Sequence, residues 1–129
     1  MPIPFRPSDV RVMSDVEAAW MGAIFEGEGS GIVGDYPSGV GHYPTRKITA
    51  VVANTDPEVL SACLRFTGSG RVYGKPAVPG HRPAFAWTIQ KRNSALDFLH
   101  QIAPYSWKAQ RTLDRAAELD ERWEGSSHS

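Results

Sequence analysis

The sequence predicts an α+β fold in which two β-hairpins alternate with amphipathic helices. Three observations support this: a capping sequence before a helix rich in small residues, two pairs of strands around Gly/Pro-containing loops, and helical apolar periodicity in the C-terminal third. The predicted order is helix, strand, strand, helix, strand, strand, helix, helix. A chain of 129 residues is expected to form one domain around a single core.

The first helix is predicted from its capping signals. Residues 1–13 contain three prolines and no periodicity, so an extended N-terminal arm is expected before it. Ser14 can accept a hydrogen bond from a free helical amide while Glu17 reaches back, which is a capping box. Glycines at positions 27, 29 and 31 permit the turn into a strand and mark the end of the helix.

A first hairpin is predicted from residues 30–36 and 45–53, which flank a loop containing glycine and proline. In the second strand Ile48, Ala50 and Val52 alternate with more polar residues. One face of this strand is therefore expected to be apolar and to face the core.

A second helix and a second hairpin follow. The segment Thr55-Asp56-Pro57-Glu58 supplies an N-cap and a proline in the first turn of a helix expected to end near Thr67. After Gly68-Ser69-Gly70 the strands are expected at residues 71–75 and 82–90. By alternation, Phe85, Trp87 and Ile89 share the apolar face.

Two helices complete the chain. Asn93 or Ser94 is expected to cap the first of them, and Pro104 ends it. The last is expected at residues 107–123. The domain is thus predicted at residues 14–123, with a polar tail at residues 124–129.

Composition limits the function. The net charge is zero, but residues 30–110 carry nine Lys/Arg against four acids, so one basic face is possible and a mixed solvated surface is the alternative. The single cysteine, Cys63, is expected to be a buried structural thiol. No apolar run approaches a membrane-spanning length and the N-terminus has no apolar core, so we expect an intracellular protein, cytoplasmic or nucleoid-associated, without a membrane partner.

Two further site types are disfavoured. The four histidines show no ligand spacing, which argues against zinc. The four tryptophans, at positions 20, 87, 107 and 123, could stack on bases, but three of them lie on apolar faces, so core packing is the favoured interpretation.

The most informative segment runs from Trp20 to Ser30. Small residues recur four apart at Ala18/Gly22, Ala19/Ala23 and Ala23/Gly27, which allows another backbone to approach the helix closely. Glu26 and Glu28 then lie at the C-terminal end of the helix, where a negative charge opposes the macrodipole. Such a site calls for a cation or a positive partner.

This segment resembles the LAGLIDADG motif of homing endonucleases, with Met21 to Gly29 on its nine positions and Glu28 on its metal-binding acid. The resemblance covers roughly residues 16–117 and includes, in the same order, Asn54-Thr55-Asp56, Gly68-Ser69-Gly70, Phe98-Leu99, Ile102-Ala103-Pro104-Tyr105 and Lys108-Ala109-Gln110. It implies a LAGLIDADG-type αββαββα domain whose antiparallel sheet forms a DNA-binding saddle.

The resemblance also implies an assembly and a chemistry. Because the chain carries one motif, a complete site requires a homodimer, with Ala19, Gly22 and Ala23 at the interface. Glu28, with the backbone carbonyl of Gly27, is expected to hold Mg²⁺ or Mn²⁺. The implied activity is site-specific cleavage of double-stranded DNA at a pseudo-palindromic site. The alternative is a non-cleaving DNA-binding regulator or RNA-splicing cofactor of the same fold, and a protein-interaction module is a third hypothesis.

Individual residues receive roles from the same resemblance. Asn54 would orient water beside Glu28, or only bond the end of its strand. Lys108 would be a catalytic lysine, or only a solvated lysine at the start of a helix. Glu26 is expected to be structural. The residues expected to contact DNA are Tyr36, Arg46, Lys47, Thr49, Arg71, Tyr73, Lys75, Arg82, Thr88 and Gln90.

Overall fold

The computed structural model describes residues 8–37, 44–74, 79–80 and 84–127, without the side chains of residues 35–37, 44–46 and 122–127. The fold is α+β, and its order of elements confirms the predicted one. The elements are α1 (Asp15–Glu28), β1 (Gly29–Pro37), β2 (Pro44–Asn54), α2 (Pro57–Thr67), β3 (Arg71–Gly74), β4 (Phe85–Ile89), α3 (Arg92–Ile102), the 3₁₀ turn η1 (Ala103–Tyr105) and α4 (Trp107–Ser127).

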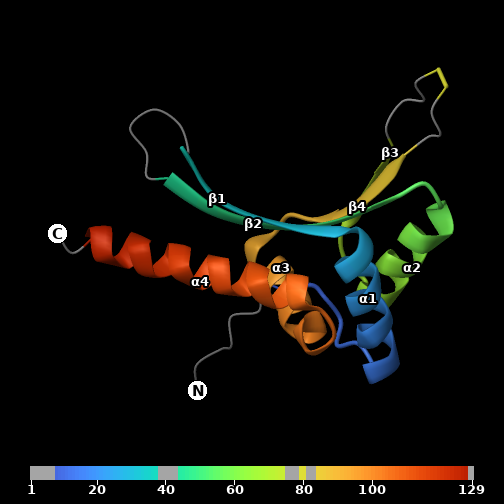
Figure 1. The fold of residues 1–129 in the computed structure, drawn as a ribbon, viewed down its shortest axis with the longest axis horizontal. Coiled ribbons are helices and arrows are strands. Elements are labelled where there is room, and N and C mark those ends of the chain that lie inside the picture. The colour runs from blue at the N-terminus through green and yellow to red at the C-terminus, as the bar shows by residue number, and fades with distance from the viewer. Residues whose placement is uncertain (1–7, 38–43, 75–78, 81–83, 128–129) are drawn as a thin grey trace.

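The described strands form one antiparallel sheet in the order β1-β2-β4-β3. Residues Ser30, Val51, Thr88 and Arg71 lie in one row across all four strands. Figure 1 shows that the sheet is curved and that the helices cover its convex face, which leaves the concave face open. The open face is the one on which a ligand of some length can lie.

The core lies between the sheet and the helices. Ile48, Ala50 and Val52 are buried, as their alternation predicts. Rings from α1, β4 and α3 meet edge to face, with centroids 5.9 Å apart for Phe25 and Phe98 and 5.1 Å apart for Trp87 and Phe98. Full burial of each such ring stabilises the fold by about 1.5–3 kcal/mol.

Local signals placed several helix ends correctly. The predicted capping box of α1 is present, because Ser14 accepts from the Glu17 amide and the Glu17 carboxylate accepts from the Ser14 amide. Asp56 caps α2, and Gly68 ends that helix in the left-handed conformation at φ 64°. Burial raises the pKa of the Cys63 thiol to about 12, which confirms an unreactive core cysteine.

Other boundaries differ from the prediction. Helix α3 begins at Arg92, and its N-cap is Lys91 without a side-chain hydrogen bond. Ser94 does not cap this helix, because its buried hydroxyl donates to Asp9 instead, at 2.7 Å. Helix α4 runs to Ser127, past the expected end at residue 123 and through part of the expected polar tail.

The described part of the N-terminal arm packs on the domain. Val10 and Met13 are buried in the core, and the Arg11 amide donates to the Thr67 carbonyl at 2.8 Å. The Asp9 carboxylate accepts from Ser69 at 2.6 Å and from Ser94. Residues 8–13 therefore connect the C-terminal end of α2 and the turn after it with α3, while residues 1–7 lie outside the described residues.

The tryptophans divide into different environments. Trp87 is fully buried, and Trp20 packs edge-on against Phe66 with centroids 5.2 Å apart. Trp107 is 80% exposed, because α4 buries Ala109 and Leu113 on its other side. The side chain of Trp123 lies outside the described residues. None of the described helices is long and apolar enough to cross a membrane.

Candidate active site and nucleic-acid interface

The junction of α1 and β1 presents Glu28. The helix passes into the strand without a loop, because Gly29 takes an extended conformation while its amide donates to the Phe25 carbonyl. A Cβ at Gly29 would overlap the Phe25 ring, so only glycine fits this junction. Glu28 is exposed at the last position of the helix. The local backbone therefore directs a carboxylate to the surface beside the first residues of the sheet.

Asn54 lies against this carboxylate. Its Nδ2 donates to Glu28 Oε2, and its Oδ1 accepts from the Asp56 amide at 2.7 Å. Asn54 is the last residue of β2, and the turn into α2 holds its side chain from the other end. The structure thus brings together two of the three predicted catalytic residues, and the strand-end hydrogen bond expected as the alternative role of Asn54 is present as well.

Glu26 has a different environment although it lies only two residues earlier. Its Oε1 accepts from the Lys108 amide and from Ser106 Oγ, both at 2.9 Å. These bonds lower the pKa of Glu26, the Lys108 amide being the larger cause and Ser106 the second. Glu26 caps the N-terminus of α4, which supports the structural role expected for it.

Lys108 follows in the first turn of α4. Ser106 caps this helix, since its Oγ accepts from the Ala109 amide at 3.1 Å. Lys108 Nζ donates to the Gly29 carbonyl at 2.8 Å, and Gly29 directly follows Glu28. Glu28, Asn54 and Lys108 therefore all converge on the α1–β1 junction, with Lys108 bound to its backbone. Ser106 is a contributor that the sequence analysis missed, and its position just before the predicted helix is the signal for an N-cap.

The junction offers hard oxygen donors to a cation. Glu28 supplies a carboxylate, and Gly27 lies in the last helical turn, where carbonyls lack intrahelical partners. Within the described residues, no group of three or more His, Cys, Asp or Glu side chains could hold a metal ion. The described part of one chain thus offers this junction the carboxylate of Glu28 and backbone carbonyls as oxygen donors.

Helix α1 has a packed face and an open face. Gly22 is buried, and a Cβ there would lie 2.5 Å from Tyr105 Cβ in the same chain. This corrects the expected place of Gly22 in a dimer interface, because its small size serves the contact with η1. Ala23 and Gly27 are exposed and Ala19 is half-buried, so these small residues remain accessible.

The open face of the sheet carries several predicted DNA contacts. Lys47, Arg71 and Tyr73 are exposed, and Thr49 is half-buried. Thr88 lies in the same row as Arg71 but is only 9% exposed, so it is less accessible than its predicted role in reading bases requires.

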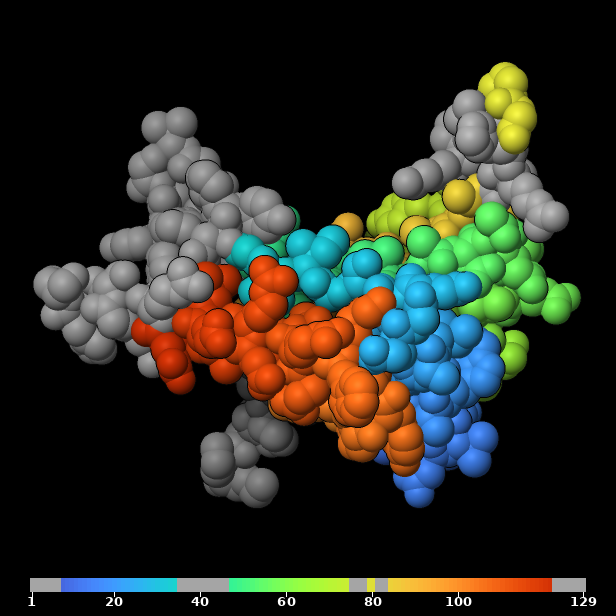
Figure 2. All heavy atoms as spheres, in the orientation of Figure 1, coloured from blue at the N-terminus to red at the C-terminus, as the bar shows by residue number. Residues whose placement is uncertain are grey.

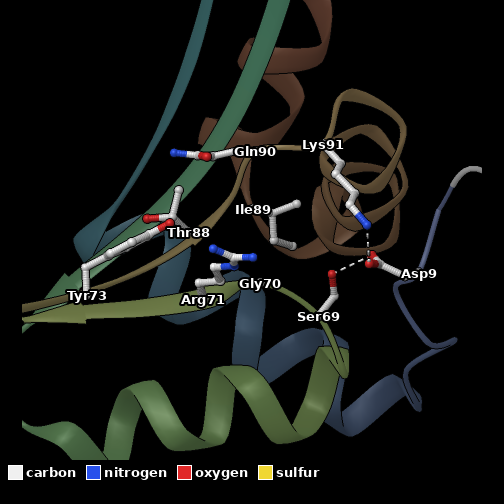
Figure 3. A pocket seen from close by; sticks show the side chains of 9 residues that line it. All are labelled: Asp9, Ser69, Gly70, Arg71, Tyr73, Thr88, Ile89, Gln90 and Lys91. Carbon is white, nitrogen blue, oxygen red and sulfur yellow. Dashed lines mark hydrogen bonds and ion pairs between the residues drawn. The ribbon is translucent and has the colours of Figure 1, made fainter.

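A pocket of about 470 Å³ opens on this face (Figure 3). Its lining includes Arg71, Tyr73 and the exposed Gln90, together with the ion pair between Lys91 Nζ and Asp9 Oδ2 at 3.3 Å. Asp9 and Lys91 were not predicted at this face. The sequence signal for Lys91 is its position directly after the predicted contact Gln90, and Asp9 has no such signal.

The remaining predicted contacts are described in part or not at all. Tyr36 and Arg46 lie in β1 and β2, but their side chains are outside the described residues. Lys75 and Arg82 also lie outside the described residues. Their predicted roles stay predictions.

Comparison with known proteins identifies the class of fold. Several solved structures of homing endonucleases match the chain with probability 1.00. The homing endonuclease I-CvuI, in complex with its target in the presence of Ca, matches with a TM-score of 0.63 at 15% identity, over 86% of this chain and 72% of that one. The chain thus has the LAGLIDADG homing endonuclease fold, as its motif predicts.

Two further structures agree. The group I intron-encoded homing endonuclease I-CeuI, complexed with DNA, matches with a TM-score of 0.63 at 19% identity, over 94% of this chain and 61% of that one. The LAGLIDADG homing endonuclease I-SmaMI, bound to cleaved DNA, matches with a TM-score of 0.61 at 14% identity, over 86% of this chain and 38% of that one. No family model matches the sequence, and no curated protein matches it. At these identities the likeness establishes the fold.

Proposed function

We propose that this protein is a homodimeric, divalent-metal-dependent endonuclease that cuts double-stranded DNA at a specific, pseudo-palindromic site. The observation that carries this proposal is the exposed Glu28 carboxylate, which Asn54 orients at the edge of an open sheet. DNA-bound homing endonucleases of the same fold support it.

The open face suits duplex DNA. Alternate side chains of strands laid along the major groove can meet base edges, and basic side chains can meet phosphates. Lys47, Arg71, Tyr73 and Gln90 are exposed on or beside this face. The polar and basic character of these residues supports DNA as the ligand of the open face.

Two features support the proposed dimer: the junction of one chain has the Glu28 carboxylate without a group of three acidic or metal-ligating side chains among the described residues, and α1 has an open face. Ala19, Ala23 and Gly27 follow one another at intervals of four residues along this face. Val16, about one turn before Ala19, is 79% exposed. Small side chains allow a second α1 helix to approach closely, and a two-fold axis there would bring both copies of Glu28 near each other. The assembled site would then contain two carboxylates.

Glu28 of each subunit and the Gly27 carbonyl would hold Mg²⁺ or Mn²⁺. When bound there, a divalent ion would supply positive charge against the developing charge of the phosphodiester and would lower the pKa of a bound water. Asn54 keeps the Glu28 carboxylate turned toward the junction by its Nδ2 hydrogen bond. Lys108 places a positive charge beside Gly29, where it can stabilise a phosphate oxygen.

The proposal is tested by selecting the bound site from random duplex DNA and then assaying cleavage of that site. Wild-type protein is expected to cut both strands in Mg²⁺ or Mn²⁺. Glu28→Gln should abolish cleavage and keep specific binding, because the amide is isosteric but uncharged. Glu58→Gln, at an exposed position of α2, is the control and should cut normally. A wild-type protein that binds its selected site but leaves it whole in both metals would refute the endonuclease.

One observation favours a second candidate, a DNA-binding protein of this fold that does not cut. The Lys108 ammonium already donates to a carbonyl of its own chain, and Asn54 is held at both ends. A junction that only stabilises the fold, without taking part in cleavage, would have the same contacts. The cleavage assay separates the two candidates, since the non-cutting protein retains specific binding.

A further inference from the structure

Helix α4 carries a row of three basic side chains. Lys108, Arg111 and Arg115 are spaced three and four residues apart, so they lie on one side of the helix. Together with Gly29, Ser30, Gly31 and Thr112 they line a pocket of about 310 Å³. None of the predicted DNA contacts on the sheet belongs to this pocket. It is a second, separate basic surface.

The pocket lies at the edge of the sheet and beside Glu28. β1 is an edge strand, and Figure 2 shows α4 adjacent to it on the viewed face. The helix packs closely on the strand at Gly31, since a Cβ at this position would overlap the Thr112 side chain. Ser30 is exposed and shares its row with Arg71 on the open face. The pocket therefore continues from the open face around the edge of β1.

The basic groups of this row make no ion pair with the described part of the chain. Lys108 Nζ donates to a neutral carbonyl, and among the described residues no ion pair includes Arg111 or Arg115. Arg111 contributes to the lowered pKa of Glu26, so these charges are near each other, but Glu26 Oε1 already accepts from Ser106 and the Lys108 amide. An anionic ligand would supply the missing charge.

We propose that the row Lys108–Arg111–Arg115 binds phosphodiester groups of duplex DNA and so forms a backbone contact on α4 that is independent of the sheet. Seven residues of helix span about 10 Å, which matches roughly three base-pair steps of one strand at 3.4 Å each. The contact rests on the proposed DNA function and deepens it. Because phosphates carry no sequence information, its role is to position the strand beside Glu28 of the same subunit.

The test is the salt dependence of binding to a mixed-sequence duplex, measured by fluorescence anisotropy between about 50 and 200 mM KCl. The double variant Arg111→Ala/Arg115→Ala leaves Lys108 intact. Its slope of log affinity against log salt should be shallower by about two for each bound subunit. The loss of affinity should be equal on the selected site and on an unrelated duplex, since a phosphate contact does not discriminate between sequences.

Matched variants control for charge and for fold. Arg111→Lys/Arg115→Lys keeps both charges and should keep the slope. Arg65→Ala removes an exposed arginine from α2, outside the pocket, and should also keep it. Thermal unfolding of each variant verifies the fold, and the single variant Arg115→Ala, expected to lose about one unit of slope per subunit, serves if the double variant does not fold.

Three results would overturn the inference, and they point to different failures. If the double variant keeps the wild-type slope while Lys47→Ala reduces it, the α4 contact is absent and the DNA function stands. If the double variant loses dimerisation in light scattering and binds DNA normally as a dimer at higher protein concentration, the row belongs to a subunit interface. If wild-type protein binds no duplex even at the lowest salt, the proposed function fails as well.

Discussion

Asp9 and Glu28 are both acidic residues near the surface, but the chain surrounds them differently. The Asp9 carboxylate accepts from Ser69, Ser94 and Lys91, and these hydrogen bonds, Ser69 first, lower its pKa from 3.8 to about 2. Among the described residues, Glu28 accepts a side-chain hydrogen bond from Asn54 alone, and it is exposed. A carboxylate whose lone pairs are occupied holds the fold together, whereas one with open lone pairs can take a ligand.

The same contrast applies within the last turn of α1. Glu26 accepts hydrogen bonds from Ser106 and from the Lys108 amide, whereas Glu28, two residues later, is exposed at the last position of the helix. Surrounding donors, and not the type of residue, thus separate the structural acid from the candidate catalytic one.

The largest effect is expected from removing the negative charge of Glu28, the acid proposed to be catalytic. Glu28→Gln should reduce double-strand cleavage by at least about 100-fold, while Asp9→Asn should leave the cleavage rate of the folded protein unchanged. Affinity for the selected site in metal-free buffer should stay equal or rise in Glu28→Gln, because a charge that repels phosphates is removed. Gel assays measure the cleavage of each variant, and fluorescence anisotropy measures its affinity for the selected site. Equal loss of cleavage in the two variants would show that the comparison is wrong.

A smaller effect is expected for Asn54, which orients Glu28 through a hydrogen bond. Asn54→Ala removes the donor to the carboxylate and should lower the cleavage rate by about 10- to 100-fold. Single-turnover cleavage at saturating protein isolates this effect from binding. Unchanged cleavage together with a lower unfolding midpoint would assign Asn54 to the end of its strand alone.

The two faces of α1 should respond differently to added volume. Gly22→Ala places a methyl group against Tyr105 and should destabilise the fold by about 1–2 kcal/mol, after the gain in helix propensity. Ala23→Leu, on the exposed face, should change the stability of the single chain by less than about 0.5 kcal/mol but prevent the dimer. Urea unfolding and light scattering measure the two effects. A wild-type protein that is monomeric at tens of micromolar, roughly the range where ordinary dimers form, would contradict the interface.

The smallest expected effect concerns acid stability. Because the pKa of Asp9 is lower in the folded state, its contribution is fully present above its ordinary pKa of 3.8 and is lost as the pH falls toward about 2. The Asp9 side chain is 48% exposed, so solvent screening reduces this contribution to about 1 kcal/mol. Urea unfolding of wild type and Asp9→Asn should differ at neutral pH and converge near pH 2. A constant difference across this range would show that Asp9 does not hold the segment through its charge.

Much of the fold could be predicted from short stretches of sequence. The capping box at Ser14 and Glu17 depends only on residues three apart, and the burial of Ile48, Ala50 and Val52 follows from the two-residue period of a strand. The contacts that the sequence analysis misjudged join distant segments. Ser94 bonds Asp9 across 85 residues, which removes it from the cap of α3.

For this protein the sequence by itself determined which residues could serve the site, since the motif carries Glu26 and Glu28 at the end of a helix of small residues. Only the tertiary structure decided which of them remains open. Ser106 and the Lys108 amide, some 80 residues away, occupy Glu26, and Tyr105 takes the space beside Gly22. The physical reason is that hydrogen-bond donors and packing volume at these positions come from α4 and η1, whose approach to α1 depends on the closure of the whole core.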